Sequence, residues 1–527
     1  MRSSLAPLIV CLAAPLVCAA QSKVWVADNG DGTYKNPVLH ADYSDPDAIR
    51  VGDQFYLTAS SFNAAPGLPI LQSQDLVNWR IIGHALPMQP PFDVYAKPRH
   101  GNGVWAPAIR FHAGEFFIFY PDPEYGIYMV HAREIGGPWS PPLLIKDAKG
   151  WIDPCPLWDD DGQAYLVSAM AGSRSGIKSV LLISRMSADG TKLLDEGRLV
   201  YDGHAQDPTI EGPKLYKRSG YYYIFAPAGG VPTGWQVVLR SRNIYGPYER
   251  RVVLKQGKTP TNGPHQGAWV ETQKGESWFL HFQDKGAYGR IVHLEPMRWV
   301  DDWPQMGNDG EPVLRYRKPD VGRAWPLETP AESDDFRDGI GLQWQWAANP
   351  QPGWALPAGG LGFLRLTAVP FPEGFKNFWD VPNLLLQKFP APRFTATTSL
   401  SFEAHQAGEE AGLIVTGLDY AYIAVRKTAD AVVVTQATAH NADRGAQETQ
   451  VTARAPQGSP IFLRVDVADG AICRFSYSAD GKQFTPVGEA FTARQGRWIG
   501  AKVGIFAIGG KAGTEYGYAD FHWFHID

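Results

Sequence analysis

The chain has 527 residues, more than one hydrophobic core usually supports, so we expect two domains. Its formal net charge is −5 and no segment is rich in lysine and arginine, which argues against a nucleic-acid partner. Because it contains 18 tryptophans, 55 glycines and 42 prolines, the composition favours a turn-rich, all-β protein.

The N-terminus has the features of an export signal over residues 1–20. Arg2 supplies a positive charge, Leu5 to Val17 form a short apolar stretch, and Cys18-Ala19-Ala20 is a small-residue cleavage site. A lipoprotein signal or a buried first strand are the alternatives. No other segment approaches the ~20 apolar residues needed to span a bilayer. The sequence therefore predicts an exported protein, periplasmic or extracellular, without a membrane span.

Cysteine usage excludes a disulfide scaffold. Beyond the predicted signal the chain has only Cys155 and Cys473, which fall in different predicted domains. We expect both to be buried small hydrophobic residues.

The sequence repeats five times between residues 21 and 318. Each repeat is a glycine followed by an aromatic, strand-forming run, and the five glycines are Gly52, Gly114, Gly162, Gly220 and Gly275. Their spacing of roughly 50 to 60 residues suits one four-stranded sheet per repeat, as in the blades of a β-propeller. The sequence therefore predicts a five-bladed β-propeller over residues 21–318.

One position of this repeat carries three acids. Nine residues before the glycine, the last four repeats have Trp105, Asp153, Glu211 and Gln266, and Asp45 lies seven residues before the first glycine. If each repeat is one blade, equivalent positions face a common axis, so these acids converge in one pocket. Paired carboxylates in one pocket are what glycoside hydrolysis requires.

Each of the three acids also stands beside a proline, immediately before a predicted strand: Asp45-Pro46, Asp153-Pro154 and Glu211-Gly212-Pro213. Proline lacks a backbone donor and is tolerated at an exposed edge, such as the innermost strand of a blade lining a channel. A single acid of this kind would be a turn carboxylate capping local amides. Three at one repeat position favour a shared site instead.

A proline-rich segment separates the repeats from a different pattern. Residues 319–332 lose the repeat and are predicted to be a linker. Residues 333–527 contain short alternating runs separated by polar turns, which predict an antiparallel β-sandwich of the concanavalin-like, jelly-roll type. This domain either binds carbohydrate or buttresses the propeller and closes one side of the pocket.

Over nearly all of its mature length, the chain resembles the family 43 glycoside hydrolases. The resemblance rests on the order of these motifs: Asn36-Pro37-Val38-Leu39, Asp45-Pro46-Asp47, Arg50-Val51-Gly52-Asp53, Ser60-Ser61-Phe62, Pro66-Gly67, Asp75-Leu76-Val77-Asn78-Trp79, Gly289-Arg290, Asp335-Phe336 and Leu342-Gln343-Trp344-Gln345-Trp346. It implies an exo-acting, inverting hydrolase without a required cofactor. The implied substrates are xylo- or arabino-oligosaccharides from hemicellulose, cleaved to release terminal β-D-xylose or α-L-arabinofuranose.

The same resemblance assigns roles to the acids. Asp45 is implied to be the general base that activates water, and Glu211 the general acid that protonates the leaving oxygen. Asp153 is implied to be the pKa modulator and orienter of that acid, since a nearby carboxylate disfavours ionisation. Asp47, two residues after Asp45, is an alternative base, which we take as a supporting hydrogen-bond acceptor.

Four further residues are candidates for substrate binding. Arg290 matches the family's substrate-binding arginine, with a surface ion pair as the alternative. Phe62 and Trp105 are candidate walls of the sugar subsite, although Phe62 is equally well explained by core packing. His265 is implied to lie at the site and to be a candidate contact for a structural calcium, with a hydrogen-bonded structural histidine as the alternative.

One departure from the family bears on the substrate. A β-xylosidase branch of the family has bulky aromatic residues where this chain has Asn63-Ala64-Ala65, so we expect a more open pocket rim. This keeps a strict α-L-arabinofuranosidase, which debranches xylan, arabinan or xyloglucan, as an alternative. A non-catalytic carbohydrate-binding propeller is a second one, and the oligomeric state stays open.

Overall fold

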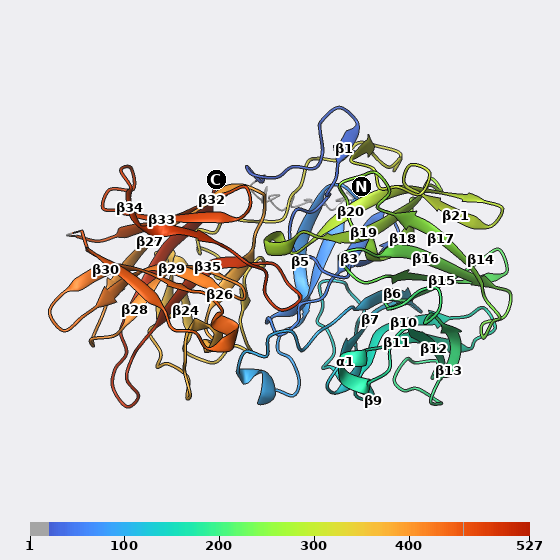
Figure 1. The fold of residues 1–527 in the computed structure, drawn as a ribbon, viewed down its shortest axis with the longest axis horizontal. Helices are drawn as coiled ribbons and strands as arrows, with labels where there is room; N and C mark the ends of the chain where they lie inside the picture. Colours follow the sequence, from blue (N-terminus) through green and yellow to red (C-terminus); the bar gives the residue numbers. More distant parts are fainter. Residues whose placement is uncertain (1–20, 457) are drawn as a thin grey trace, which may run out of the picture.

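A computed structural model describes residues 21–456 and 458–527 of the chain. It shows two all-β domains lying side by side (Figure 1). The predicted export signal, residues 1–20, lies outside the described residues. Within the described residues, no helix has the length and apolar character needed to cross a membrane.

The first domain is the predicted five-bladed β-propeller, made of five four-stranded antiparallel sheets. In each sheet the strands follow one another in chain order. The first three blades are β2 (Asp47–Val51), β3 (Gln54–Thr58), β4 (Gly67–Ser73) and β5 (Trp79–Leu86); β6 (Ala108–His112), β7 (Glu115–Asp122), β8 (Gly126–Ala132) and β9 (Leu143–Asp147); and β10 (Trp151–Trp158), β11 (Ala164–Met170), β12 (Val180–Met186) and β13 (Arg198–Asp202). The last two are β14 (Lys214–Arg218), β15 (Tyr221–Ala228), β16 (Trp235–Ser241) and β17 (Glu249–Lys255); and β18 (His265–Glu271), β19 (Ser277–Asp284), β20 (Arg290–Val300) and β21 (Trp303–Met306). The short helices of this domain are η1 (Val94–Ala96), α1 (Gly172–Ser175) and η2 (Gly286–Tyr288).

The five repeat glycines occupy the same place in every blade, the turn between the first and second strands. All have positive φ angles: 61° at Gly52, 85° at Gly114, 81° at Gly162, 75° at Gly220 and 79° at Gly275. Tight hairpin turns need this left-handed conformation, which glycine adopts without steric cost. The repeat in the sequence is therefore a repeat of turn chemistry.

The ring closes where the N-terminal segment meets blade five. Leu39 and Val292 exchange backbone hydrogen bonds of 3.3 and 3.0 Å, and β1 (Thr33–Lys35) pairs with β22 (Arg315–Arg317). Apolar side chains fill the spaces between neighbouring blades, as where Leu57 of blade one and Leu280 of blade five share one core. Burial between blades holds the innermost strands at fixed positions around the axis.

The second domain is the predicted concanavalin-like sandwich, made of two seven-stranded antiparallel sheets. One sheet has the order β23 (Gln345–Trp346), β26 (Leu385–Lys388), β35 (Lys502–Ile508), β28 (Glu410–Thr416), β29 (Tyr420–Lys427), β30 (Val432–Ala439) and β31 (Thr449–Arg454). The other has the order β24 (Ala355–Ala358), β25 (Phe363–Thr367), β36 (Tyr518–Ile526), β27 (Phe394–Glu403), β32 (Ile461–Ala468), β33 (Ile472–Ser478) and β34 (Thr485–Thr492). Its short helices are η3 (Gly359–Leu361), η4 (Phe378–Asp380) and η5 (Ala442–Arg444). Cys473 is buried here and Cys155 in the propeller, both as free thiols.

The domains meet along a hydrogen-bonded seam that includes residues 63–65. Ala65 and Trp346 exchange backbone hydrogen bonds of 3.1 and 2.6 Å, and the Asn63 amide donates to the Ala347 carbonyl at 2.6 Å. All three residues of Asn63-Ala64-Ala65 are buried. The expectation that they open the rim of the pocket is therefore wrong, because their small size instead permits close approach of the sandwich.

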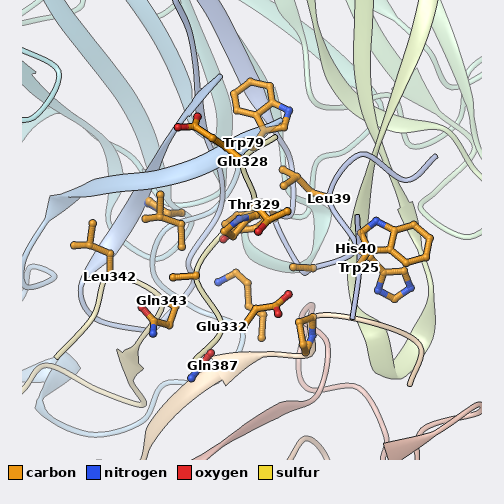
Figure 2. A pocket seen from close by; sticks show the side chains of 18 of the residues that line it. Trp25, Leu39, His40, Trp79, Glu328, Thr329, Glu332, Leu342, Gln343 and Gln387 are labelled. Carbon is orange, nitrogen blue, oxygen red and sulfur yellow. The ribbon is translucent and has the colours of Figure 1, made fainter. Parts of the chain in front are cut away.

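A small cavity of about 60 Å³ lies between the N-terminal segment, the segment 328–332 and strand β26 (Figure 2). Trp25 and His40 pack together at one side of it, and Ser22 donates a 2.7 Å hydrogen bond to Glu332 at another. Burial raises the pKa of Glu332 to about 7. None of the predicted site residues lines this cavity.

Candidate active site

A larger cavity, of about 650 Å³, receives a residue from every blade. The five residues at the repeat position all line it: Asp45, Trp105, Asp153, Glu211 and Gln266. Phe62 and Arg290 line it too, so six of the seven predicted site residues share one cavity. Three carboxyl groups thus meet there, although they are far apart in the sequence.

Local backbone distortions aim these side chains at the axis. The ladder between β10 and β11 shifts register between Ile152 and Cys155, around Asp153, and the ladder between β18 and β19 shifts around Gln266. Asp45, Asp153 and Gln266 have positive φ angles of 56°, 55° and 37°. Such conformations are costly for residues other than glycine and concentrate at functional sites.

Donors surround the Asp45 carboxylate. Its Oδ2 accepts hydrogen bonds from the hydroxyls of Ser60 at 2.5 Å and Ser44 at 2.9 Å. The Arg290 guanidinium lies 3.2 and 3.3 Å from its two oxygens and donates to Ser44 at 2.8 Å. Arg290 is buried, so the alternative of a surface ion pair does not apply. A carboxylate fixed in one orientation by donors and a cation is positioned to act as a general base toward a water molecule in the cavity.

Asp42 holds the backbone of Arg290 in place. Its Oδ1 accepts the Arg290 N–H at 2.9 Å, and its Oδ2 accepts the Gly500 N–H of the sandwich at 2.9 Å. Gly289 has a φ of 75°, and a Cβ there would lie 2.5 Å from the Asp42 carboxyl carbon. One buried carboxylate therefore joins the base's arginine to the second domain.

Asp153 and Glu211 form an interacting pair of acids. Asp153 Oδ2 accepts the N–H of Gly212 at 2.6 Å, which fixes the peptide that follows Glu211. Burial and then the negative charge of Glu211 raise the pKa of Asp153 well above its usual range. Ionising both carboxyls would place two negative charges in one site, so the pair retains a proton more readily than a single carboxyl would.

His265 lies behind Glu211 rather than on the cavity wall. Its ring is fully buried, and its Nε2 is 3.0 Å from Glu211 Oε1. His265 does not line the cavity, so it contacts Glu211 instead of the sugar that was predicted as its partner. Through this contact it can hold that carboxyl in position.

The donors near His265 do not fit a calcium site formed by the protein alone. Calcium takes six to eight oxygen ligands, whereas His265 offers a nitrogen, Nδ1, which is buried and lacks a partner among the described residues. The group of described residues whose donor atoms converge is His281, His293 and Glu295 of blade five, with two nitrogens and one oxygen. Calcium at His265 stays a prediction.

Asp47 is separate from the cavity. Its carboxylate accepts the Ile109 N–H at 2.7 Å and pairs with Arg110 at 2.7 Å, which fastens blade one to blade two. Asp45 is therefore the better candidate for the base, and Asp47 supports the ring.

The sandwich contributes an aromatic wall that the sequence did not indicate. Trp498, in the loop between β34 and β35, lines the cavity and packs edge-on against Trp105, with 6.2 Å between ring centroids. Trp498 is 53% exposed and has a positive φ of 65°. Its place depends on contacts between domains, such as the Ala501 N–H to Ala287 carbonyl bond of 2.7 Å, which no local pattern reveals.

Family models match both domains. Residues 34–304 match the glycosyl hydrolases family 43, and residues 333–527 match the beta-xylosidase C-terminal concanavalin A-like domain. The chain is a family 43 glycosyl hydrolase.

Its relatives span its whole architecture. A putative beta-xylosidase of Xylanibacter ruminicola is 41% identical over 498 residues, covering 92% of this chain and 88% of the relative. A non-reducing end alpha-L-arabinofuranosidase of Bacteroides ovatus is 28% identical, covering 93% and 94%. The crystal structure of a xylan beta-1,4-xylosidase from Bacillus halodurans superposes with a TM-score of 0.83 at 25% identity, covering 94% and 99%. This glycosidase therefore shares both domains with xylosidases and arabinofuranosidases.

The raised pKa of Asp153 should lower the free energy of unfolding at neutral pH. With its pKa raised, folded Asp153 holds a proton that the unfolded chain releases above about pH 4, so the free energy of unfolding falls as pH rises through that window. Asparagine at this position carries no charge and can still accept the Gly212 N–H. We expect Asp153→Asn to raise the unfolding temperature at pH 7 by on the order of 1–3 °C, with no gain near pH 3.

Calorimetry across pH 3–8 measures this difference, and initial rates should show a loss of activity of about 100-fold. If Asp153→Asn unfolds at a lower temperature than wild type at pH 7, the predicted destabilising effect of Asp153 is contradicted.

Trp498 should contribute to substrate binding but little to stability. Because the ring is half exposed, Trp498→Ala removes a sugar-packing surface without opening a cavity in the core. We expect KM for an aryl glycoside to rise by about 3–10-fold with a nearly unchanged unfolding temperature. Phe371→Ala, at an exposed aromatic of the sandwich away from the cavity, is the matched control. An unchanged KM in Trp498→Ala would remove Trp498 from the subsite.

Proposed function

We propose that the enzyme is an exo-acting, inverting glycosidase that releases a terminal pentose, β-D-xylose or α-L-arabinofuranose, from hemicellulose oligosaccharides. The observation that carries this proposal is the difference between two acids in one cavity. Asp45 is held by hydroxyls and the Arg290 cation, whereas Glu211 lies beside a second carboxyl and an imidazole. Two acids in contrasting environments suit one base and one acid.

Asp45 is the proposed base. In an inverting reaction a water molecule attacks the anomeric carbon while a carboxylate takes its proton. Ser44, Ser60 and Arg290 all bind Asp45, so the carboxylate keeps one orientation as the water approaches. Because the two carboxyls come from blades one and four of the ring, they can meet the separation of ~6.5–9.5 Å that an inverting reaction needs to admit the water.

Glu211 is the proposed acid, and it gives its proton to the leaving oxygen as the glycosidic bond breaks. Its side chain is 30% exposed, so the carboxyl can reach a substrate in the cavity. Asp153 fixes the adjacent peptide, and the two neighbouring carboxyls together retain a proton that Glu211 can give to the leaving oxygen. Reprotonation from solvent then restores Glu211, and Asp45 returns its proton to solvent.

The position of the sandwich domain supports the proposal that the enzyme acts on chain ends. Trp498 of the sandwich forms part of the cavity wall next to Trp105, and a wall supplied by the second domain favours the end of a sugar chain over its middle. The relatives named xylosidase and arabinofuranosidase support a pentose in the subsite. A strict α-L-arabinofuranosidase is the second candidate, favoured by the Bacteroides ovatus relative that matches over both domains. We also propose export, on the sequence of residues 1–20 alone.

The two acids should respond differently to the leaving group. We expect Asp45→Ala and Glu211→Ala each to lower kcat at least about 1,000-fold on natural oligosaccharides. An aryl glycoside with a good leaving group needs no protonation, so it should partly rescue only Glu211→Ala. Rates on aryl β-D-xylopyranosides and aryl α-L-arabinofuranosides test both roles and sugars together. Rescue of Asp45→Ala instead would reverse the assignment, and an inert wild type would favour a carbohydrate-binding protein.

The anomeric configuration of the first product should be inverted. A direct attack by water, without a covalent intermediate, places the new hydroxyl on the opposite face of the sugar from the leaving group. Proton NMR during the first minutes of hydrolysis, before mutarotation, distinguishes the two anomers. A retained configuration would require one acid to act as a nucleophile and would exclude the proposed mechanism.

A further inference from the structure

We infer that Gln266 binds a hydroxyl group of the sugar in the cavity through its side-chain carboxamide, and thereby helps to select the terminal sugar. The inference rests on the proposed function, because it concerns the same cavity. It adds a residue from blade five to a site that the acids of blades one, three and four otherwise define.

The backbone presents Gln266 to the cavity in the same way as the acids. Gln266 stands at the repeat position, on a bulge of β18, with a φ of 37°. A residue with a side chain is strained in this conformation, and such strain persists where the surrounding structure holds it. The bulge interrupts the regular alternation of β18, so that Gln266 lines the cavity while its neighbour His265 lies behind Glu211.

The carboxamide has no partner in the protein. Gln266 is only 5% exposed and neither polar side-chain atom forms a hydrogen bond with any other described residue; its Oε1 is buried from solvent, whereas Nε2 is not among the buried unpaired atoms and is the one that can face the cavity. Buried amides in folded proteins are nearly always hydrogen-bonded, because an unsatisfied one is costly. A group that lines a cavity and lacks a partner is suited to bond the molecule that fills the cavity. Water can occupy the place in the free enzyme, and a sugar hydroxyl can replace it.

Close packing prevents the carboxamide from turning to another partner. A Cβ on Gly212 would lie 2.6 Å from Gln266 Cγ and 2.7 Å from Cδ, so the side chain lies directly on the peptide that follows Glu211. The same peptide donates its N–H to Asp153. Gln266 is therefore held beside the proposed acid, and a hydroxyl bound to it belongs to the sugar whose bond is cleaved.

A carboxamide both donates and accepts, so it can satisfy both functions of a hydroxyl group. A sugar that lacks this hydroxyl leaves the amide unsatisfied, and discrimination should be strong for that reason. Removal of the amide should remove the discrimination as well. This predicted loss of selectivity separates binding of a hydroxyl from a merely structural role.

The experiment compares wild type and Gln266→Met on an aryl pentoside and its monodeoxy analogues. Methionine keeps the length of glutamine without its polar atoms. We expect one deoxy position to lower kcat/KM of wild type by about 10–100-fold, and the same position to have little effect in Gln266→Met, whose kcat/KM on the parent sugar is lowered by a similar factor. Gln236→Met is the matched control, because Gln236 is equally buried with a free Oε1 among the described residues but lies outside the cavity.

Equal deoxy penalties in wild type and Gln266→Met would overturn the inference while leaving the proposed function intact. A wild type that cleaves no aryl pentoside would overturn the proposed function itself. If Gln266→Met does not fold, Gln266→Leu, which also lacks polar side-chain atoms and adds no charge beside the acids, provides the comparison. A deoxy profile identical to that of wild type in this variant would likewise contradict the inference.

Discussion

The buried carboxylate of Asp42 holds the catalytic cavity and the two domains in one arrangement. It accepts the backbone N–H of Arg290 with one oxygen and that of Gly500 with the other, both at 2.9 Å. Arg290 extends from that backbone to Asp45, and Gly500 lies two residues after Trp498. A Cβ on Gly500 would lie 2.6 Å from the Gly289 nitrogen, so the two loops touch through their main chains. The cation beside the proposed base and the aromatic wall of the sandwich therefore share a single anchor.

The charges of two nearby lysines explain why a carboxylate is suited to the position of Asp42. Lys388 of β26 and Lys502 of β35 stand directly opposite each other in the sandwich, where like charges repel. Burial, followed by the charge of Lys388, lowers the pKa of Lys502 to about 7, and the Asp42 carboxylate opposes that shift. Burial raises the pKa of Asp42, and Lys388 opposes this in turn. The propeller thus supplies a negative charge where the sandwich buries two positive ones, so each domain reduces the electrostatic cost of the other.

The sequence predicts the parts of this molecule that local chemistry determines. The five turn glycines repeat because each blade needs a left-handed residue at one hairpin, and the acids can be found by counting from them. Their convergence then follows from the symmetry of a closed ring. Contacts between domains leave no such pattern: Trp498 reaches the cavity through a loop placed by Asp42, and Asn63-Ala64-Ala65 is buried under the sandwich instead of lining the rim. His265 was predicted to lie at the site and contacts Glu211 there, whereas Gln266, at the counted repeat position, is the neighbour that lines the cavity.

The arrangement places the acids and one wall of the sugar site on different domains. Asp153 stands on the innermost strand β10, and Asp45 and Glu211 immediately precede the innermost strands β2 and β14, so changes in outer loops leave the acids in place. The wall formed by Trp498 belongs to a loop of the other domain, and that loop can change its side chains as long as Gly500 still reaches Asp42. Relatives named for xylose and for arabinofuranose share both domains with this chain, as expected if part of the selection lies in such loops and part in residues such as Gln266. Because the same anchor holds Arg290, a loop change that displaced Gly500 would disturb the base as well, which limits such changes to those that preserve the seam.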